Sequence, residues 1–174
     1  LRAVRPNTGS SRGFYVQDTT LQPFSGIFVF TGSSPPGVAV GNQVDIAGTY
    51  TEFFNLSEIE SPTVTIVNPG ATLPFSPIAI SNPATIATGG AQAEGHESML
   101  VEIANVTVLT LNPDAPQDFD EFAVTGNLRI DDELNPTQDN VFVVGTAFTK
   151  ITGVLTYSFS NFKLEPRNDG ELVP

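Results

Sequence analysis

The chain has 174 residues, enough to bury a hydrophobic core in one large domain or in two small ones. The absence of Cys excludes disulfides and thiol chemistry, and 15 Gly with 14 Pro interrupt the sequence too often for long amphipathic helices. With 19 Asp and Glu against seven Lys and Arg, the net charge of -12 disfavours nucleic acid as a partner. No run is long and apolar enough for membrane insertion.

Alternation of apolar and polar residues predicts β-strands along the chain. In chain order, the alternating runs are residues 13–17, 27–30, 44–50, 63–67, 100–109, 122–125, 141–144 and 151–159. Turn sequences separate them, among them Pro35-Pro36-Gly37, Asn68-Pro69-Gly70 and Asn112-Pro113-Asp114. This spacing favours an all-β barrel or sandwich.

The middle of the chain, residues 68–95, has a different composition. It is rich in Pro, Ala, Thr and Gly, and its single charged residue is Glu94. One short strand is expected at 77–80, and the segment has no continuous core pattern of its own. We expect a connector that packs along the surface.

The two halves of the chain share one pattern. Both carry, in the same order, a glycine, a mid-strand glycine, a large side chain and a phenylalanine: Gly41, Gly48, Tyr50 and Phe54, then Gly145, Gly153, Leu155 and Phe159. A mid-strand glycine lets a long strand bend sharply and serve two sides of a small barrel, so Gly48 and Gly153 are the predicted bends. We therefore expect a first unit at residues 1–67 and a second at 96–174, joined by the 68–95 connector.

Several stretches carry a family resemblance. They are residues 13–18, 25–30, 40–53, 98–108, 129–132 and 151–166, of which the last, with Gly153-Val154-Leu155, Tyr157-Ser158-Phe159 and Asn161-Phe162 in that order, is the most specific. Together they resemble the OB-fold-like region of secreted bacterial nucleases of the ExeM/YhcR type. The resemblance implies two OB-like units of the five-stranded barrel type in tandem. It also implies a non-catalytic region beside a metal-dependent nuclease domain, and it places no catalytic residue on this chain.

The residues themselves also argue against an enzyme. A phosphodiesterase or a nucleophilic triad needs an oriented His, and His96 is the only one, flanked by Glu94 and Glu97. We favour a solvated loop histidine over a metal ligand at this position.

Two acidic clusters are the candidate metal sites, Asp118 with Asp120 and Asp131 with Asp132. Calcium is the one cofactor that such loops would hold, since it takes several oxygen ligands from a loop. Neither cluster has the spacing of an EF-hand, so we favour solvated acidic loops. Asp131 and Asp132 rank higher because they end a predicted strand.

A polymer-binding surface is the other candidate site. OB barrels bind single strands or sugars with exposed aromatic and basic groups. Alternation separates Phe14 from Tyr15, and Tyr15 is the predicted surface aromatic. The candidate basic patch is Arg2, Arg5 and Arg12, although the net charge of -12 opposes binding to a nucleic-acid backbone.

The leading hypothesis is a non-catalytic accessory module, extracellular or on a bacterial cell surface, that positions an adjacent catalytic domain or binds a polymer weakly. Leu1 is expected to be a processed end or a fragment boundary, since no initiator Met precedes it. One alternative is a structural subunit of a surface layer or filament that self-associates through strand edges, with calcium neutralising its acidic faces. Another is an autonomous nucleic-acid-binding module.

Overall fold

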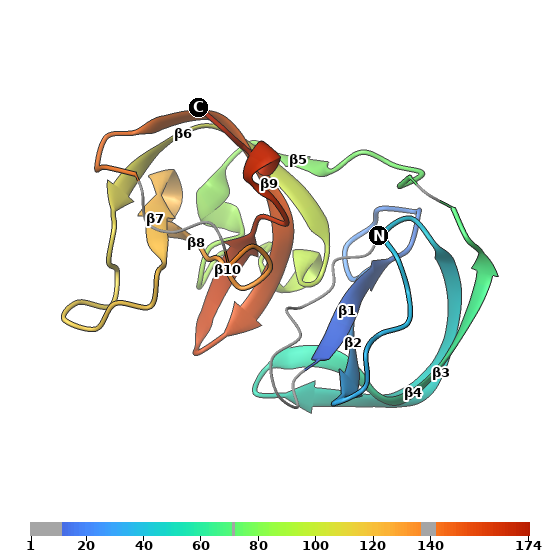
Figure 1. Cartoon of the computed structure of the whole chain (residues 1–174). Helices are drawn as coiled ribbons and strands as arrows, with labels where there is room; N and C mark the ends of the chain where they lie inside the picture. The colour runs from blue at the N-terminus through green and yellow to red at the C-terminus, as the bar shows by residue number, and fades with distance from the viewer. Residues whose placement is uncertain (1–11, 71, 137–141) are drawn as a thin grey trace.

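The structure, a computed structural model, describes residues 12–70, 72–136 and 142–174 (Figure 1). Its strands are β1 (Arg12–Gln17), β2 (Gly26–Gly32), β3 (Gln43–Phe53), β4 (Leu56–Asn68), β5 (Ile78–Ile80), β6 (Leu100–Thr110), β7 (Phe122–Val124), β8 (Leu128–Ile130), β9 (Ala147–Ser158), β10 (Asn161–Glu165) and β11 (Leu172–Val173). Its helical elements are short 3-10 turns: η1 (Pro83–Thr85), η2 (Glu94–His96), η3 (Thr125–Asn127) and η4 (Asp169–Glu171). The predicted all-β class is confirmed.

The second half of the chain forms a closed five-stranded barrel. Around it, β6 pairs with β7, β7 with β8 and β10 with β9, all antiparallel, whereas β8 and β10 are parallel. The barrel closes where β9 returns antiparallel to β6. This order, with one parallel contact between the third and fifth strands, is OB-like. Outside the barrel, β5 pairs with β6 and β11 with β9.

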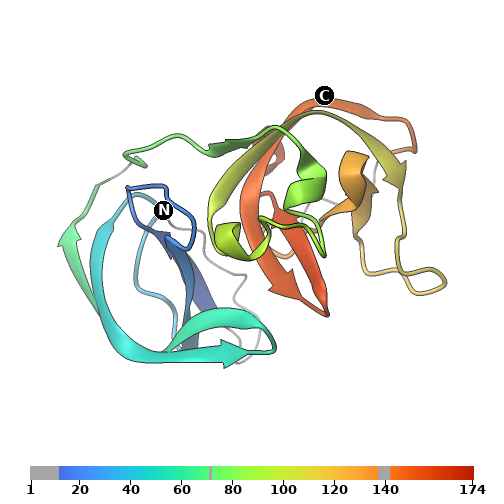
Figure 2. The same cartoon turned by 180° about the vertical axis from the view of Figure 1, so that it is seen from behind.

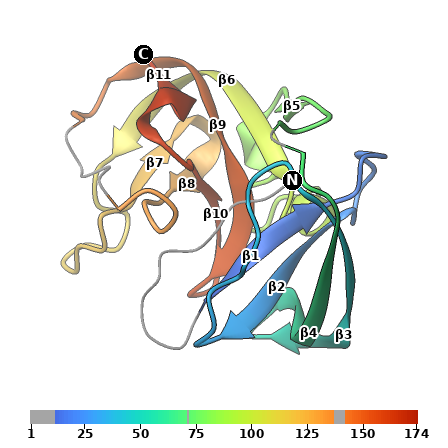
Figure 3. The same ribbon diagram turned by 45° about the vertical axis from the view of Figure 1, so that its right-hand side comes forward.

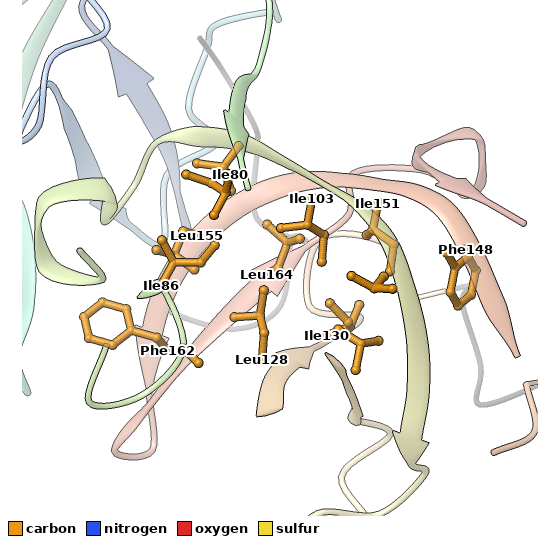
Figure 4. Close-up of a cluster of buried hydrophobic side chains, with 14 of the residues drawn as sticks. Ile80, Ile86, Ile103, Leu128, Ile130, Phe148, Ile151, Leu155, Phe162 and Leu164 are labelled. Carbon is orange, nitrogen blue, oxygen red and sulfur yellow. The ribbon is translucent and has the colours of Figure 1, made fainter. Parts of the chain in front are cut away.

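The barrel interior is filled with apolar side chains, as the alternation predicts for strands with one buried face. Figure 4 shows side chains from β5, β6, β8, β9 and β10 converging between the strands. Near one end, Phe142 and Phe148 meet edge to face, with ring centroids 5.0 Å apart. Phe142 belongs to a loop before β9. The chain turns directly after it, where Thr146 N–H donates to the Val143 carbonyl at 3.0 Å. The described part of the predicted 141–144 strand is therefore a turn.

The first half forms a four-stranded sheet in the order β1-β2-β4-β3. Its contacts are antiparallel, parallel and antiparallel in turn, which repeats the contacts of β7, β8, β10 and β9. Four strands of the barrel thus have counterparts in the first sheet. A tandem of two closed barrels is not confirmed, because the described residues of the first half form an open sheet.

Both predicted bend glycines lie where a partner strand approaches closely. At Gly48, the register between β3 and β4 shifts, and a Cβ atom would stand 2.8 Å from the Glu60 carbonyl oxygen. At Gly153, a Cβ atom would stand 2.7 Å from the Glu165 carbonyl. Figure 1 shows that β3, β4 and β9 are strongly curved. Glycine at these two positions permits the close crossing.

The first sheet packs against the outside of the barrel. Tyr15, Phe28 and Leu56 form one apolar cluster with Leu100 and Val154 of the barrel. Three hydrogen bonds connect the same surfaces: Tyr15 Oη donates to Thr156 Oγ1 at 3.0 Å, Leu100 N–H to Gln17 Oε1 at 2.8 Å, and Ser57 N–H to Glu97 Oε1 at 2.9 Å. These contacts fix how the two halves sit against one another.

The connector at 68–95 was expected to pack along the surface, and only part of it does. Its short strand is present as β5. Ile80, Ile86, Ala87 and Ala93, however, are buried in the core cluster of the barrel. This burial is favourable because it removes the apolar side chains of the connector from water.

Candidate functional site

The strongest candidate site consists of two hairpin tips. One tip joins β3 to β4 through Phe54 and Asn55, whose φ angles are 50° and 65°. The other joins β9 to β10 through Phe159 and Ser160, with φ angles of 48° and 66°. Positive φ at both central residues is the geometry of the tightest β-hairpin turn. In Figures 1, 2 and 3 both tips lie at the end of the molecule opposite the C-terminus.

Each tip places a phenylalanine in solvent. The exposed fractions are 83% for Phe54 and 91% for Phe159. Bulky residues rarely adopt positive φ, and these turns favour Asn, Asp or Gly at the first central position. An exposed apolar ring in a strained conformation contributes little to folding. Its presence at equivalent positions in both halves therefore points to a role in contact with another molecule.

The first tip carries a group of exposed aromatic residues. The Phe53 and Phe54 rings meet edge to face with centroids 4.7 Å apart, and Phe53 and Tyr50 are themselves exposed. Glu52 accepts hydrogen bonds from the Tyr50 hydroxyl and, at 2.7 Å, from Ser57 Oγ. The bond to Glu52 raises the pKa of Tyr50. The tip thus combines ring faces with hydroxyl and carboxylate groups.

The second tip rests on a network of charges. Lys163 Nζ lies 5.5 Å from the centroid of the Phe159 ring, and it donates to Asp131 Oδ2 at 3.0 Å and to the Glu121 carboxylate. Burial alone would lower the pKa of Lys163, but these carboxylates raise it, so the ammonium stays charged. Arg129 extends the network by donating to Glu121 Oε2 at 2.9 Å. The network fixes a cation beside the exposed ring.

The predicted polymer-binding residues do not form a site in the described part of the chain. Arg2 and Arg5 lie outside the described residues. Arg12 is partly buried at the start of β1. Tyr15 is fully buried, and its prediction as a surface aromatic was wrong, because its side of β1 faces the barrel.

The candidate metal ligands have other partners. Asp131 is buried against Lys163, and Asp118 Oδ1 accepts from Asp120 N–H at 3.2 Å. Burial, with repulsion from Asp131 and Asp120, raises the pKa of Asp132 from 3.8 to about 6. Across 12–70, 72–136 and 142–174, no three His, Cys, Asp or Glu side chains are grouped so as to hold a metal ion. The calcium hypothesis therefore gains no support.

The His96 corner holds a buried carboxyl group. His96 Nδ1 lies 2.9 Å from the Gln92 carbonyl oxygen, which orients the ring toward the backbone. Glu97 is 4% exposed, and its Oε2 has no hydrogen-bond partner among the described residues. Burial is the main cause that raises the pKa of Glu97 from 4.5 to about 7. This group links the barrel to the first sheet through Ser57.

Comparison with known proteins adds no relative. No protein-family model, curated protein or solved structure matches the chain. In the part of the chain that the structure describes, no helix has both the length and the apolar character needed to cross a lipid bilayer.

Proposed function

We propose that the chain is a non-catalytic accessory module of a secreted bacterial protein, and that it binds a polymer weakly through Phe54 and Phe159. One observation carries the proposal: the same exposed side chain occupies the same strained turn position in both halves of the chain. In OB barrels, the loop between the fourth and fifth strands is one of the elements that contact oligosaccharides and oligonucleotides. The β9–β10 hairpin is this loop of the barrel, and the β3–β4 hairpin is its counterpart in the first sheet.

Charge favours a neutral polysaccharide as the polymer. The net charge of -12 repels nucleic acids and other polyanions, and the first tip adds Glu52 beside its rings. Sugar rings have apolar faces that can stack on aromatic side chains, and their hydroxyl groups can bond to Tyr50, Glu52 and Ser57. Because both tips lie at one end of the molecule, one polymer chain can contact both, and two weak contacts then reinforce each other.

The accessory role rests on the packing of the two halves and on the family resemblance. The apolar cluster around Tyr15 and Leu100 holds the two tips in one arrangement, as a module that positions a neighbouring domain requires. The resemblance to ExeM/YhcR-type nucleases supports an extracellular setting and a nuclease as that neighbour. Binding to the polymer would then hold the neighbouring nuclease domain close to that polymer.

Affinity electrophoresis tests the binding proposal. We expect gels that contain hydroxyethyl cellulose, xylan or galactomannan to retard the chain in at least one case. Replacing both tips, Phe54→Ala with Phe159→Ala, should weaken retardation at least about tenfold, because each aromatic contact contributes about 1 kcal/mol. Phe119→Ala is the matched control, since Phe119 is 60% exposed but lies outside the tips. Absence of retardation in every gel, or an equal loss in the control, would refute the proposal.

A gel shift at low salt tests the alternative that the chain binds nucleic acid. We expect no shift with single-stranded or double-stranded DNA, since the chain and the probe carry the same sign of charge. A shift that disappears with both tip substitutions would instead assign the tips to nucleic acid.

A further inference from the structure

The contact between the two halves determines how the two tips are spaced. Phe54 belongs to the first sheet and Phe159 to the barrel, and among the described residues the sheet and the barrel share no strand. The halves meet instead through the apolar cluster around Tyr15 and through hydrogen bonds between side chains and backbone. A polymer that contacts both tips therefore binds most tightly when this contact is firm.

A buried carboxyl group is part of the contact. Glu97 directly follows η2, and its Oε1 accepts the Ser57 N–H of β4 at 2.9 Å. Only 4% of Glu97 is exposed. Ser57 lies three residues after Phe54, in the hairpin that carries the first tip. The bond therefore connects this hairpin directly to the half of the chain that forms the barrel.

The surroundings of Glu97 disfavour a negative charge on its carboxyl group. The titratable groups around it come from η2 and β3: Glu94, His96, Tyr50 and Glu52. Burial is the largest cause that raises the pKa of Glu97, and the charges of Glu94 and Glu52 raise it further. Ser57, which faces it from β4, supplies an uncharged N–H. Ionisation thus places a charge in a buried contact beside two other carboxylates.

We propose that protonation of Glu97 regulates polymer binding by holding the two tips at a fixed spacing. At acidic pH the uncharged carboxyl group stays in the contact, and the tips act together. At alkaline pH the ionised group favours water, so the first sheet loosens from the barrel and the tips bind as two separate weak sites. This regulation rests on the proposed binding at Phe54 and Phe159, and it gives that binding a preference for acidic pH.

The size of the change follows from the pKa of Glu97 in the two states of the contact. In the closed contact it is about 7, whereas a solvated carboxyl group in the open state has the ordinary value of 4.5. The proton therefore stabilises the closed contact fully below pH 4.5, and this contribution is lost as the pH rises through 7. Between about pH 5 and about pH 8, the equilibrium constant for opening should rise about 70-fold.

Pulsed electron paramagnetic resonance on the whole chain measures the tip spacing without any polymer. The chain contains no Cys, so Asn55→Cys with Ser160→Cys places one spin label on each turn. We expect a narrow distance distribution at about pH 5 and a broad one at about pH 8. Glu97→Gln should stay narrow at both, because its side chain does not titrate. Two controls, Asp45→Asn on the exposed side of β3 and His96→Gln beside Glu97, should broaden as the unaltered chain does.

Affinity electrophoresis at the same two pH values measures the effect on binding. In the gel that retards the chain most, retardation relative to a polymer-free gel should be at least about tenfold stronger at the lower pH, and it should be equal at both for Glu97→Gln.

The two measurements distinguish failure of the regulation from failure of the binding. Equal spacing at both pH values in the unaltered chain overturns the regulation, as does broadening that persists in Glu97→Gln or retardation that ignores a change in spacing. If Glu97→Gln does not fold, the spacing and retardation of the unaltered chain at the two pH values decide. Absence of retardation in every gel at both pH values overturns the binding itself, and the regulation with it, even where the spacing responds.

Discussion

Replacing Glu97 with Gln should remove much of the pH dependence of folding. Glu97 is buried between the barrel and the first sheet, where its Oε1 accepts the Ser57 N–H and its Oε2 has no partner among the described residues. Gln has nearly the same shape and keeps an oxygen that can accept from Ser57. The substitution therefore removes the titration while leaving the hydrogen bond.

The size of the effect follows from the pKa of Glu97. Burial raises this pKa from 4.5 to about 7 in the folded chain, so the folded state holds the proton more tightly than the unfolded state does. The stabilising contribution is complete below pH 4.5 and is lost as the pH rises through 7. At about 1.4 kcal/mol per pH unit, the free energy of unfolding should fall by about 3 kcal/mol across this range.

Urea unfolding between about pH 4.5 and about pH 8 at constant ionic strength measures this loss. The unaltered chain should lose about 3 kcal/mol more than Glu97→Gln over that range. Asp132, whose pKa is raised to about 6, titrates in both proteins and cancels in the comparison. Glu94→Gln removes an exposed charge that adds a smaller part to the raised pKa of Glu97, so this variant should keep most of the pH dependence. If Glu97→Gln keeps the full pH dependence, the carboxyl group is not buried as described.

Two further substitutions test the barrel. Lys163→Met leaves Asp131 without its cation and leaves Glu121 paired with Arg129 alone, so it should lower the free energy of unfolding by about 3 kcal/mol or more. The control Lys150→Met breaks an exposed 3.2 Å pair with Glu102 and should cost less than about 1 kcal/mol in the same urea titration. Gly153→Ala should destabilise by about 1–3 kcal/mol, because its Cβ meets the backbone of Glu165. A calorimetric melting temperature equal to that of Gly170→Ala, whose Cβ meets only a side-chain oxygen at 3.1 Å, would contradict this reason.

Local patterns were sufficient to predict the fold class and the positions of most strands. The predicted strands at residues 13–17 and 100–109 coincide with β1 and β6 almost residue for residue. The strand predicted at residues 141–144 was wrong in its described part, because its Val residues precede a turn at Gly145, where φ is 91°. β10 was not predicted as a separate strand, since only the turn at Phe159 and Ser160 separates it from β9.

The candidate site was harder to predict, because exposure depends on tertiary packing. Alternation correctly separates Phe14 from Tyr15, but it does not indicate which side of a strand meets solvent. Phe14 and Tyr15, on opposite sides of β1, are both fully buried, and Tyr15 packs against the barrel. Phe54 and Phe159 were aligned in the repeat, and the following Asn55 and Ser160 are typical turn residues. That turn signal could have indicated exposed rings at both tips.

The contact between the two halves connects these features. Phe54 belongs to the first sheet and Phe159 to the barrel, so the position of one ring relative to the other depends on the surface where the halves meet. Ser57, whose N–H donates to Glu97, lies close to the first tip in the same hairpin. Ionisation of Glu97 places a buried negative charge at that surface near neutral pH. The surface that sets the spacing of the two aromatic tips is thus also the one whose stability depends on pH.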